Sequence, residues 1–588
     1  MKKARAFLKT LFNLRNTTST PSQAKMDSSE RYCYNPVLHW NPQVEDYFVK
    51  AYGAEHFTRI SKALTRPSCY SCIRVNTLKT TSDAVSEKLE KILQNSGPEN
   101  AADGTNLTKM DTDGLISKSQ IPGLDYVLFV KGSGPHVINH GCAPDKPPKE
   151  IIVSRKCAEA VLRGAQVYVP GVMACSAHVE KGDVVAVSVA VEQAGLNGGW
   201  SIGMTRGTVL QGSPTDPYYV ERDGLYIGEG KTMMSRAGIF RVSEGLAVDM
   251  NNRVFKLPSF HDVLEGEIFL QNLPSIVTAH ALDPQKGERV LDMCAAPGGK
   301  TTAIAILMKD EGEVIAVDRS HNKVLDIQKL ATEMGLNCIT TYKLDALKAV
   351  CRRNENNISL GNSNGVVTIQ GSESLRFNDE NISSGDAERL KADATCTEKV
   401  RNEKANERTY VSKADIRKYM RRMKNGPGRN QCLGGRVDNS KGFDPNSFDR
   451  VLLDAPCSAL GLRPRLFAGE ETIESLRNHG KYQRRMFDQA VQLVRPGGVI
   501  VYSTCTINPG ENEALVRYAL DTYKFLSLAS QNPRIGGPGL VGRCEFPDGY
   551  IEEWLRPGEE ELVQRFDPSA PLDTIGFFIA KFTVGSKD

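Results

Sequence analysis

Short apolar runs that stop at polar residues recur through the second half of the chain. Segments with helical spacing of apolar residues separate these runs, and the alternation predicts parallel strands joined by helices from Asp283 onward. In such a sheet ligands lie beyond the carboxyl ends of the strands, so the residues that follow each run are the candidates for chemistry. The runs are Arg289–Met293, Val314–Val317, Ile339–Leu344, Val451–Leu453 and Val499–Tyr502.

The first half of the chain shows two other patterns. Between Tyr32 and Leu93, apolar residues at helical spacing precede a strand-like run at Ile73–Leu78, and the polar stretch 94–118 is typical of a loop. From Ile151 onward, short Val-rich runs are separated by glycine turns, which predicts a small β-rich module of about a hundred residues. Its first element is a predicted helix over Val153–Ala165, and its strands are expected at 167–171, 182–189 and 202–210.

Two segments have almost no apolar periodicity. Residues 351–447 are rich in Asn, Ser, Lys, Glu and Arg, which predicts a disordered insertion between two strands. Its basic cluster at 417–424 is open to RNA contact or a targeting role, although a solvated segment is favoured. Residues 1–31 form a predicted disordered basic tail, because no acidic residue occurs before Asp27. That composition also resembles an organelle transit peptide.

Composition limits the classes of function. The chain has 588 residues, 40% of them hydrophobic, and a net charge of +4, so two to four domains are expected and any grip on RNA must be local. Fourteen scattered cysteines and the lack of an apolar run long enough for a membrane span favour a reduced intracellular compartment. Cys69 and Cys72 lack the second pair that a zinc site needs, so no metal is expected. A predicted helix carries Lys481, Arg484 and Arg485, and we interpret this basic face as solvated in preference to an RNA groove.

Two strand ends carry thiols. Val451–Leu453 leads into Asp454 and Cys457, and Val499–Tyr502 leads into Cys505. A thiolate adds readily to electron-poor carbons, although a thiol of ordinary pKa, about 8.5, is mostly protonated at neutral pH. Addition at C6 of cytosine makes C5 nucleophilic enough to accept a methyl group from a sulfonium donor. A carboxyl group at N3 stabilises the charge that develops in that step.

A glycine turn and two strand-end acids indicate a nucleotide-like cofactor. The turn lies in the segment Cys294–Lys300, immediately before an Ala- and Ile-rich helix, and it matches neither the P-loop spacing nor GxGxxG. Its two glycines allow a backbone to approach a ligand closely at a helix amino terminus. Asp318 ends the next strand, at a position where nucleotide folds place an acid for ribose hydroxyls, and Asp345 ends the strand after it. Together these features suggest a cofactor of the adenosine type.

These same residues resemble a known family. The segment Cys294–Lys300, Asp318, Asp345 and the motifs "DAPCSALG" and "VYSTCTINPGENE" look like the Sun-domain (RsmB-like) family of S-adenosylmethionine-dependent RNA cytosine-C5 methyltransferases, and "IRVNTLK" resembles its amino-terminal lobe. The runs "LRGAQVYVPGV" and "KGDVVAV" resemble a PUA module, a small RNA-binding barrel. The combination is similar to the family's PUA-bearing tRNA methyltransferase, which modifies a cytosine near the 3′ end of the acceptor stem. The family commonly has glycine where this chain has Ala459.

The resemblance implies an architecture. It consists of an α/β, Rossmann-like, seven-stranded methyltransferase domain at 283–588, an α+β amino-terminal lobe at 32–150 and 258–282, and an inserted PUA β-barrel at 151–257. Residue roles follow by position. The implied catalytic residues are Cys505 as nucleophile, Cys457 for product release, Asp454 for holding the cytosine, and Lys300. The implied cofactor-binding residues are Cys294, Ala295, Ala296, Pro297, Gly298, Gly299, Lys300, Asp318, Asp345 and Asp454, and the implied RNA contacts are Arg163 and Tyr168.

The sequence therefore predicts a monomeric cytoplasmic enzyme whose cofactor is S-adenosyl-L-methionine and whose partner is tRNA with its CCA end, without a membrane or a metal. Three alternatives stay open. The first is a non-catalytic RNA-binding assembly factor. The second is a methyltransferase for another RNA, such as mRNA or rRNA. The third is a DNA methyltransferase, which would use the Pro-Cys thiol as nucleophile. Mitochondrion, chloroplast and nucleus are alternative locations.

Overall fold

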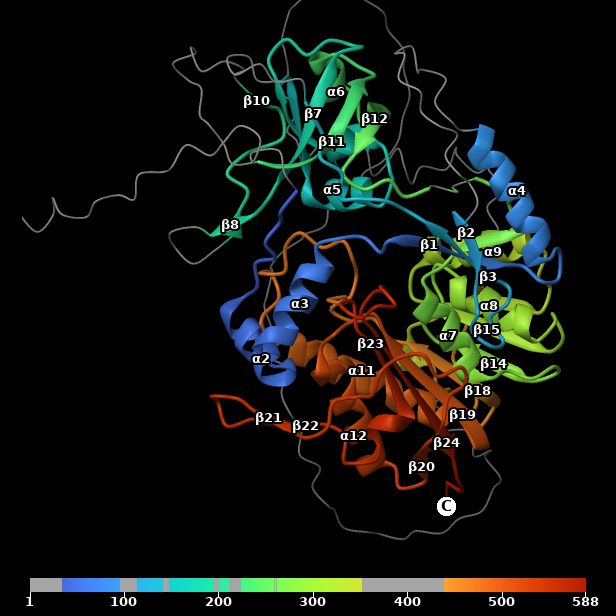
Figure 1. Ribbon diagram of the computed structural model, residues 1–588. Helices are drawn as coiled ribbons and strands as arrows, with labels where there is room; N and C mark the ends of the chain where they lie inside the picture. The colour runs from blue at the N-terminus through green and yellow to red at the C-terminus, as the bar shows by residue number, and fades with distance from the viewer. Residues whose placement is uncertain are drawn as a thin grey trace, which may run out of the picture. The chain divides into compact units, whose positions relative to one another are not determined.

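The computed structural model describes residues 34–95, 114–140, 148–194, 200–210, 224–258, 260, 262–351 and 438–587 (Figure 1). The predicted tail, 1–31, and most of the predicted insertion lie outside these residues. Strands within the described part form three sheets of four or more strands and two short two-stranded ribbons. No helix in the described ranges is long and apolar enough to cross a bilayer.

The carboxyl-terminal half is built on a largely parallel sheet. Its described strands run in the order β17-β16-β15-β14-β18-β19-β24-β20, and β23 pairs with β24. Neighbours from β17 to β19 are parallel, whereas β24 is antiparallel to β19. The bounds are β14 Arg289–Asp292, β15 Glu313–Asp318, β16 Ile339–Lys343, β17 Asp438–Asn439, β18 Phe448–Asp454, β19 Val494–Thr504, β20 Leu526–Leu528, β23 Val563–Phe566 and β24 Phe577–Val584.

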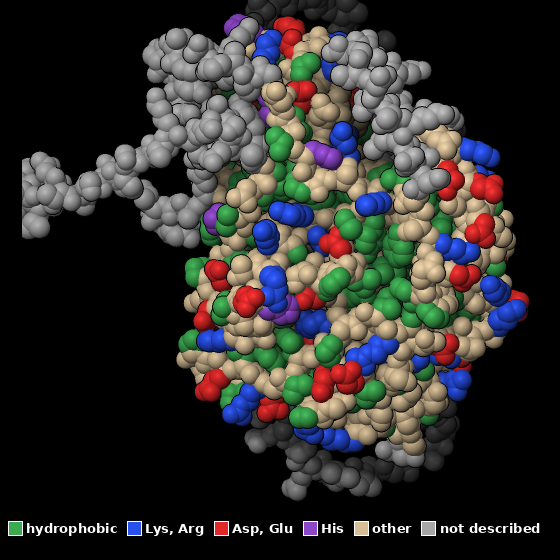
Figure 2. Space-filling model, in the orientation of Figure 1, with side chains coloured by type: hydrophobic (Ala, Val, Ile, Leu, Met, Phe, Trp, Pro, Cys, Tyr) green, Lys and Arg blue, Asp and Glu red, His purple; other side chains and the backbone are tan. Residues whose placement is uncertain are grey.

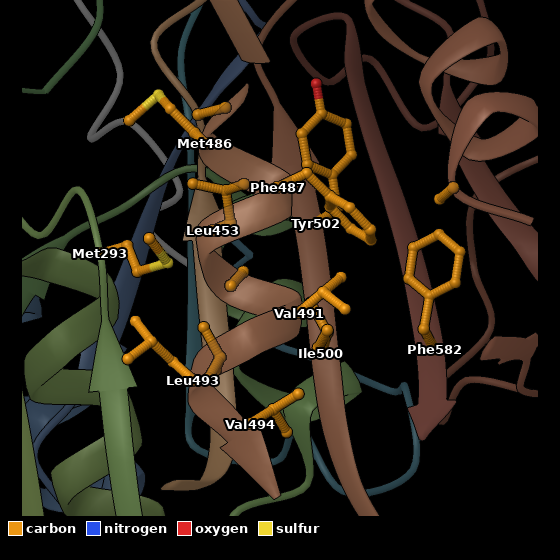
Figure 3. Close-up of a cluster of buried hydrophobic side chains, with 14 of the residues drawn as sticks. Met293, Leu453, Met486, Phe487, Val491, Leu493, Val494, Ile500, Tyr502 and Phe582 are labelled. Carbon is orange, nitrogen blue, oxygen red and sulfur yellow. The ribbon is translucent and has the colours of Figure 1, made fainter. Parts of the chain in front are cut away.

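Helices cover both faces of this sheet because alternate strand residues point to opposite sides. Leu453, Ile500 and Tyr502 pack with Met486 and Phe487 of α11, as Figure 3 shows. The intervening strand residues, such as Leu452 and Val501, belong to a separate cluster with α7 and α8. The helices are α7 Leu273–Leu282, α8 Gly299–Leu307, α9 His321–Met334, α11 Ile473–Leu493 and α12 Glu513–Thr522.

The amino-terminal lobe contains an antiparallel sheet in the order β13-β1-β3-β2. Strand β1 ends at Val75, whereas the sequence predicted a run to Leu78, because Asn76 turns the chain by bonding to backbone groups near Leu78 and Gly266. The elements are α2 Pro42–Tyr52, α3 Ala54–Leu64, β1 Tyr70–Val75, α4 Ser82–Asn95, β2 Ile116–Lys118, β3 Val127–Lys131 and β13 Ile268–Leu270.

A third sheet is formed by residues 150–253, which precede those of the largely parallel sheet in the sequence. Its described strands run in the order β10-β6-β4-β7-β11-β12-β5. Ser154 caps the helix that opens it, by accepting a hydrogen bond from the Cys157 backbone. The elements are β4 Glu150–Ser154, α5 Arg155–Leu162, β5 Val167–Tyr168, β6 Val172–Ser176, β7 Val184–Ala190, β10 Thr208–Leu210, β11 Leu225–Thr232, α6 Arg236–Arg241 and β12 Leu246–Arg253, with the ribbon β8 Gln193–Ala194 and β9 Trp200–Ser201 beside them.

The sheet edge holds residues that the sequence had assigned to the insertion. Strand β17 pairs with Tyr342 and Lys343 of β16, and Phe443 packs edge-on against Phe448. The backbone N–H of Cys351 donates to the Phe443 carbonyl at 2.8 Å. A two-residue strand gives no periodicity, so the sequence pattern could not separate 438–447 from the residues before it.

Candidate active site

Two cysteines meet at the carboxyl ends of adjacent parallel strands. Asp454 ends β18 opposite Ser503 of β19, so Cys457 and Cys505 leave the sheet at the same edge. Their Sγ atoms lie 3.4 Å apart, and both side chains are partly buried. The structure thus brings together the pair that the sequence had placed on two separate strand ends.

The two thiols differ in acidity. The contact with Cys505, together with burial, raises the pKa of Cys457 well above its ordinary value. The hydrogen bond from Cys457 lowers the pKa of Cys505, and the nearby Lys300 ammonium acts in the same direction against burial. The arrangement therefore favours a Cys505 thiolate that accepts a hydrogen bond from a neutral Cys457 thiol.

A lysine–aspartate pair stands beside the thiols. Lys300 Nζ lies 2.7 Å from Asp454 Oδ2, and the Ser503 hydroxyl donates to Asp454 Oδ1 at 2.7 Å. Burial alone would lower the pKa of Lys300, but the Asp454 carboxylate outweighs it and raises that pKa. Lys300 therefore stays charged and holds Asp454 in place, with the ring of Phe577 5.4 Å from its ammonium.

A buried carboxylate that the sequence analysis missed ties the two cysteine loops together. Glu511 is fully buried, and it accepts hydrogen bonds from the Ser458 backbone N–H at 3.0 Å, from Gln483 Nε2 at 2.7 Å and from Asn508 Nδ2 at 2.9 Å. The Ser458 hydroxyl donates to it as well. Glu511 lies in the quoted run "NPGENE", and an acid inside a buried strand-end motif is the signal that could have identified it.

A cavity of about 740 Å³ opens next to this cluster. Cys294, Asp318 and Asp345, all predicted cofactor residues, line it, and Pro456 brings its wall to the Cys457 loop. Strand-end carboxylates in a cavity of this size fit the ribose and amino-acid parts of S-adenosylmethionine. Further lining residues that the sequence analysis missed are Arg319, Ser320, Lys323, Asn478, His479 and Tyr482. The last three recur at helical spacing on α11, which is the pattern that could have indicated them.

The glycine turn packs closely against the amino-terminal lobe. Gly298 adopts φ +102°, which closes the turn before α8. A Cβ on Gly299 would lie 2.8 Å from Phe269 of the amino-terminal lobe, so this glycine allows close packing of protein on protein. In the described residues, none of Ala295, Ala296, Pro297, Gly298, Gly299 and Lys300 lines the 740 Å³ cavity.

The two predicted RNA contacts lie on the β-rich module. Tyr168 of β5 is 56% exposed. Arg163 follows α5 and lines a cavity of about 230 Å³ together with Gln271, Asn272 and Arg463. Ile575 lines the same cavity and packs in the hydrophobic cluster that Cys505 touches.

Comparisons with known proteins agree with this geometry. A family model described as 16S rRNA methyltransferase RsmB/F matches residues 279–357 and 375–582, and a PUA-domain model matches residues 149–191. The rRNA (cytosine-C(5))-methyltransferase NOP2C of Arabidopsis thaliana is 67% identical over 100% of this chain and 97% of the relative. The tRNA (cytosine(72)-C(5))-methyltransferase NSUN6 of Homo sapiens is 32% identical over 93% of this chain and 98% of its own length.

A solved structure is similar over the same span. The crystal structure of NSun6 from Pyrococcus horikoshii with SFG, an analogue of S-adenosylmethionine, covers 93% of this chain and 99% of its own, with a TM-score of 0.59 and 26% identity. The predicted Rossmann-like fold, PUA domain and S-adenosylmethionine dependence are confirmed by these matches.

Proposed function

The chain belongs to the RsmB/F family of S-adenosylmethionine-dependent RNA cytosine-C5 methyltransferases, and from that premise we propose that it methylates a cytosine near the 3′ end of a tRNA acceptor stem through a covalent adduct with Cys505. The observation that carries the covalent step is the 3.4 Å contact between the two thiols at one sheet edge, beside Lys300 and Asp454. The tRNA substrate is supported by the full-length match to the human tRNA (cytosine(72)-C(5))-methyltransferase.

In this proposal Cys505 is the nucleophile. Its thiolate forms a bond to C6 of cytosine, and the electron pair of the C5–C6 double bond moves toward C5, N3 and O2. In this step Asp454 takes a proton from Lys300 and passes it to N3, where that charge accumulates, and Ser503 fixes its carboxyl group by the contact described above. When bound, S-adenosylmethionine supplies an electrophilic methyl group to C5. The cavity residues Asp318 and Asp345 hold it.

Cys457 completes the cycle. Once C5 carries the methyl group, a base removes the C5 proton, the double bond re-forms and the C6–sulfur bond breaks. Cys457 donates a hydrogen bond to the departing Cys505 sulfur, since its raised pKa keeps it protonated. Its loss is therefore expected to slow release of the RNA more than formation of the adduct.

Substitution of each cysteine tests the assignment. Cys505→Ala is expected to abolish methyl transfer, and Cys457→Ala is expected to leave enzyme trapped on RNA, visible as a slow band on denaturing gels. Cys338→Ala serves as the control, because Cys338 directly precedes β16 and so lies away from the carboxyl ends of the strands, where Cys457 and Cys505 meet. An adduct that needs Cys457 and survives loss of Cys505 would reverse the roles.

Recognition of the 3′ end is the second part of the proposal. A cytosine in a paired stem must be unstacked before a thiolate reaches C6, which costs a few kcal/mol that other contacts must offset. Single-stranded RNA ends are typically held by stacking and by arginine, and Tyr168 and Arg163 supply those groups. Arg163 lines the 230 Å³ cavity, and Ile575 of the same cavity belongs to the hydrophobic cluster against which Cys505 packs.

A second candidate substrate is rRNA, and two experiments separate it from tRNA. The 67% identity to a protein named as an rRNA methyltransferase favours rRNA as this second candidate. Removing CCA from the tRNA, or combining Arg163→Ala with Tyr168→Ala, is expected to lower kcat/KM by about tenfold, equivalent to about 1.4 kcal/mol, without changing cofactor affinity. Bisulfite mapping of cellular RNA with and without the protein identifies the methylated position. Equal rates on intact and trimmed tRNA, or a lost site in rRNA, would remove the tRNA proposal.

A further inference from the structure

A second groove lies against α11, on the other side of the loop that follows Cys505. Its volume is about 190 Å³, and its walls come from α11, from the segment around Asn508 and Gly510, and from the hairpin formed by β21 (Arg543–Glu545) and β22 (Ile551–Glu553). We call it the α11 groove. The cofactor cavity uses different residues of the same helix, so α11 separates two openings.

The floor of the α11 groove is part of the catalytic loop. The Gly510 backbone N–H donates to the Tyr47 hydroxyl at 3.1 Å, and that hydroxyl lies 2.6 Å from the Glu552 carboxylate. A Cβ on Gly480 would lie 3.1 Å from the Gly510 carbonyl, so the helix approaches the loop closely. An occupant of the groove therefore touches the segment that carries Cys505.

Basic side chains line this groove and its rim, and Arg484 acts electrostatically on one acid there, Glu552. Lys481 and Arg485 are exposed, Arg484 is half-buried, and none of the three forms an ion pair with another described residue. The buried Nε of Arg484 has no hydrogen-bond partner in the described part of the chain. Lys and Arg are mixed with Asp and Glu on the face seen in Figure 2.

Aromatic rings complete the groove. Arg477 is bonded to Asp548 and contacts two neighbouring rings, with its guanidinium 4.4 Å from the Phe546 centroid and 4.5 Å from that of Tyr550. Tyr550 keeps 38% of its surface exposed. Cations interleaved with exposed aromatic rings are the usual equipment of single-stranded nucleic-acid sites. The sequence favoured a solvated helix face here, because the hairpin that forms the opposite wall is distant along the chain.

We propose that the α11 groove is an RNA-contact site that holds one unpaired nucleotide of the substrate, with its phosphate at Lys481 and Arg484 and its base on Tyr550. The proposal rests on the family's action on RNA and is independent of the acceptor-stem assignment. RNA is the favoured occupant because the unpaired charge is positive and lies beside the catalytic loop, where the substrate must pass. Glu552, which also lines the groove, is already engaged by Tyr47 and Trp554.

The test compares two variants that each lose two positive charges. Lys481→Ala with Arg484→Ala changes the groove, whereas Lys329→Ala with Lys524→Ala removes exposed lysines from α9 and from the end of α12. Binding of a fluorescent twelve-nucleotide single-stranded RNA is measured by anisotropy over a range of salt concentrations. The groove variant is expected to bind about tenfold more weakly, with a salt slope smaller by about 0.7, since the two cations hold one phosphate and each phosphate contact contributes about 0.7.

Tyr550 gives a test that does not depend on charge. Tyr550→Ala is expected to weaken RNA binding by about tenfold, as for loss of one stacked base, while Tyr550→Phe keeps the ring and wild-type affinity. Cofactor affinity, measured by calorimetry, should be unchanged in every variant, which shows that the fold is retained.

Three outcomes would overturn the proposal. These are equal salt slopes for the two double variants, no effect of Tyr550→Ala, and displacement of the RNA by a twelve-residue polyglutamate at similar concentration, which would indicate a general anion surface. None of these readouts requires methylation of tRNA. Failure of the acceptor-stem assignment would therefore leave these readouts unaffected. Failure of the groove proposal would likewise leave the acceptor-stem assignment unaffected.

Discussion

Asp292 offers a test of how burial controls ionisation beneath the active site. It ends β14, is 1% exposed, and accepts a hydrogen bond from the Thr301 hydroxyl at 2.8 Å through Oδ2, whereas Oδ1 has no partner among the described residues. Burial raises the pKa of Asp292 from 3.8 to about 7, and the charge of Asp454 acts in the same direction. The carboxyl group is therefore neutral in the folded protein at moderately acidic pH.

The sign and size of the effect follow from this shift. The unfolded chain loses the Asp292 proton near pH 4, but the folded protein keeps it until about pH 7, so stability is fully present below pH 4 and falls as pH rises to about 7. At about 1.4 kcal/mol per pH unit over about three units, the loss is about 4 kcal/mol. Asp292→Asn cannot ionise, so at pH 8 it is expected to be more stable than wild type by about that amount.

Denaturant unfolding without cofactor at pH 5, 6, 7 and 8 measures this difference. Asp310→Asn is the matched control, since backbone hydrogen bonds from Cys338 and Asn337 lower the pKa of Asp310 in spite of its partial burial. That variant should be less stable than wild type above pH 4. Parallel pH curves for wild type and Asp292→Asn would refute the reasoning, because they would show that Asp292 ionises normally in the folded state.

Three further predictions concern the strand-end loops. Glu511→Gln replaces an oxygen that accepts hydrogen bonds by a nitrogen that donates them, in a site surrounded by donors. The loss of two charge-assisted hydrogen bonds should lower the unfolding free energy by about 3–5 kcal/mol and reduce methyl transfer. An unchanged melting curve would contradict this prediction. Ala459 has φ +55°, which is strained for a residue with a Cβ, and Ala459→Gly should raise the unfolding free energy by about 1 kcal/mol in the same assay; no gain would mean that the strain is absent. Diamide, which is itself reduced, should oxidise Cys457 and Cys505 to a disulfide, since their sulfurs are 3.4 Å apart. Methylation should then stop, and dithiothreitol should restore it. A loss of methylation that dithiothreitol cannot reverse would argue against a disulfide.

The strand-end chemistry was predictable because it follows from one rule of parallel sheets. Apolar runs ending at Asp454 and Tyr502 implied neighbouring strands, and the register between Asp454 and Ser503 brings the thiols together. The strand-end acids Asp318 and Asp345 were found in the same way. Local sequence order was sufficient in each case, since each residue follows its own strand directly.

Contacts between distant segments were not predictable. Tyr47 and Glu552 are 505 positions apart, yet they form one wall of the α11 groove, and neither position is unusual in its own neighbourhood. Phe269 packs against Gly299, and nothing near Gly299 in the sequence indicated that contact. Chain topology, and not periodicity, determines such contacts, so they appear only with the fold.

The position of α11 has a consequence for how substrate and cofactor influence each other. Tyr482 lines the cofactor cavity, while Gln483, the next residue, donates to the Pro456 carbonyl and to Glu511. A displacement of this helix on cofactor binding would therefore move both cysteine loops. Thermodynamic linkage requires the effect to be mutual: whatever factor the cofactor contributes to RNA affinity, RNA must return to cofactor affinity.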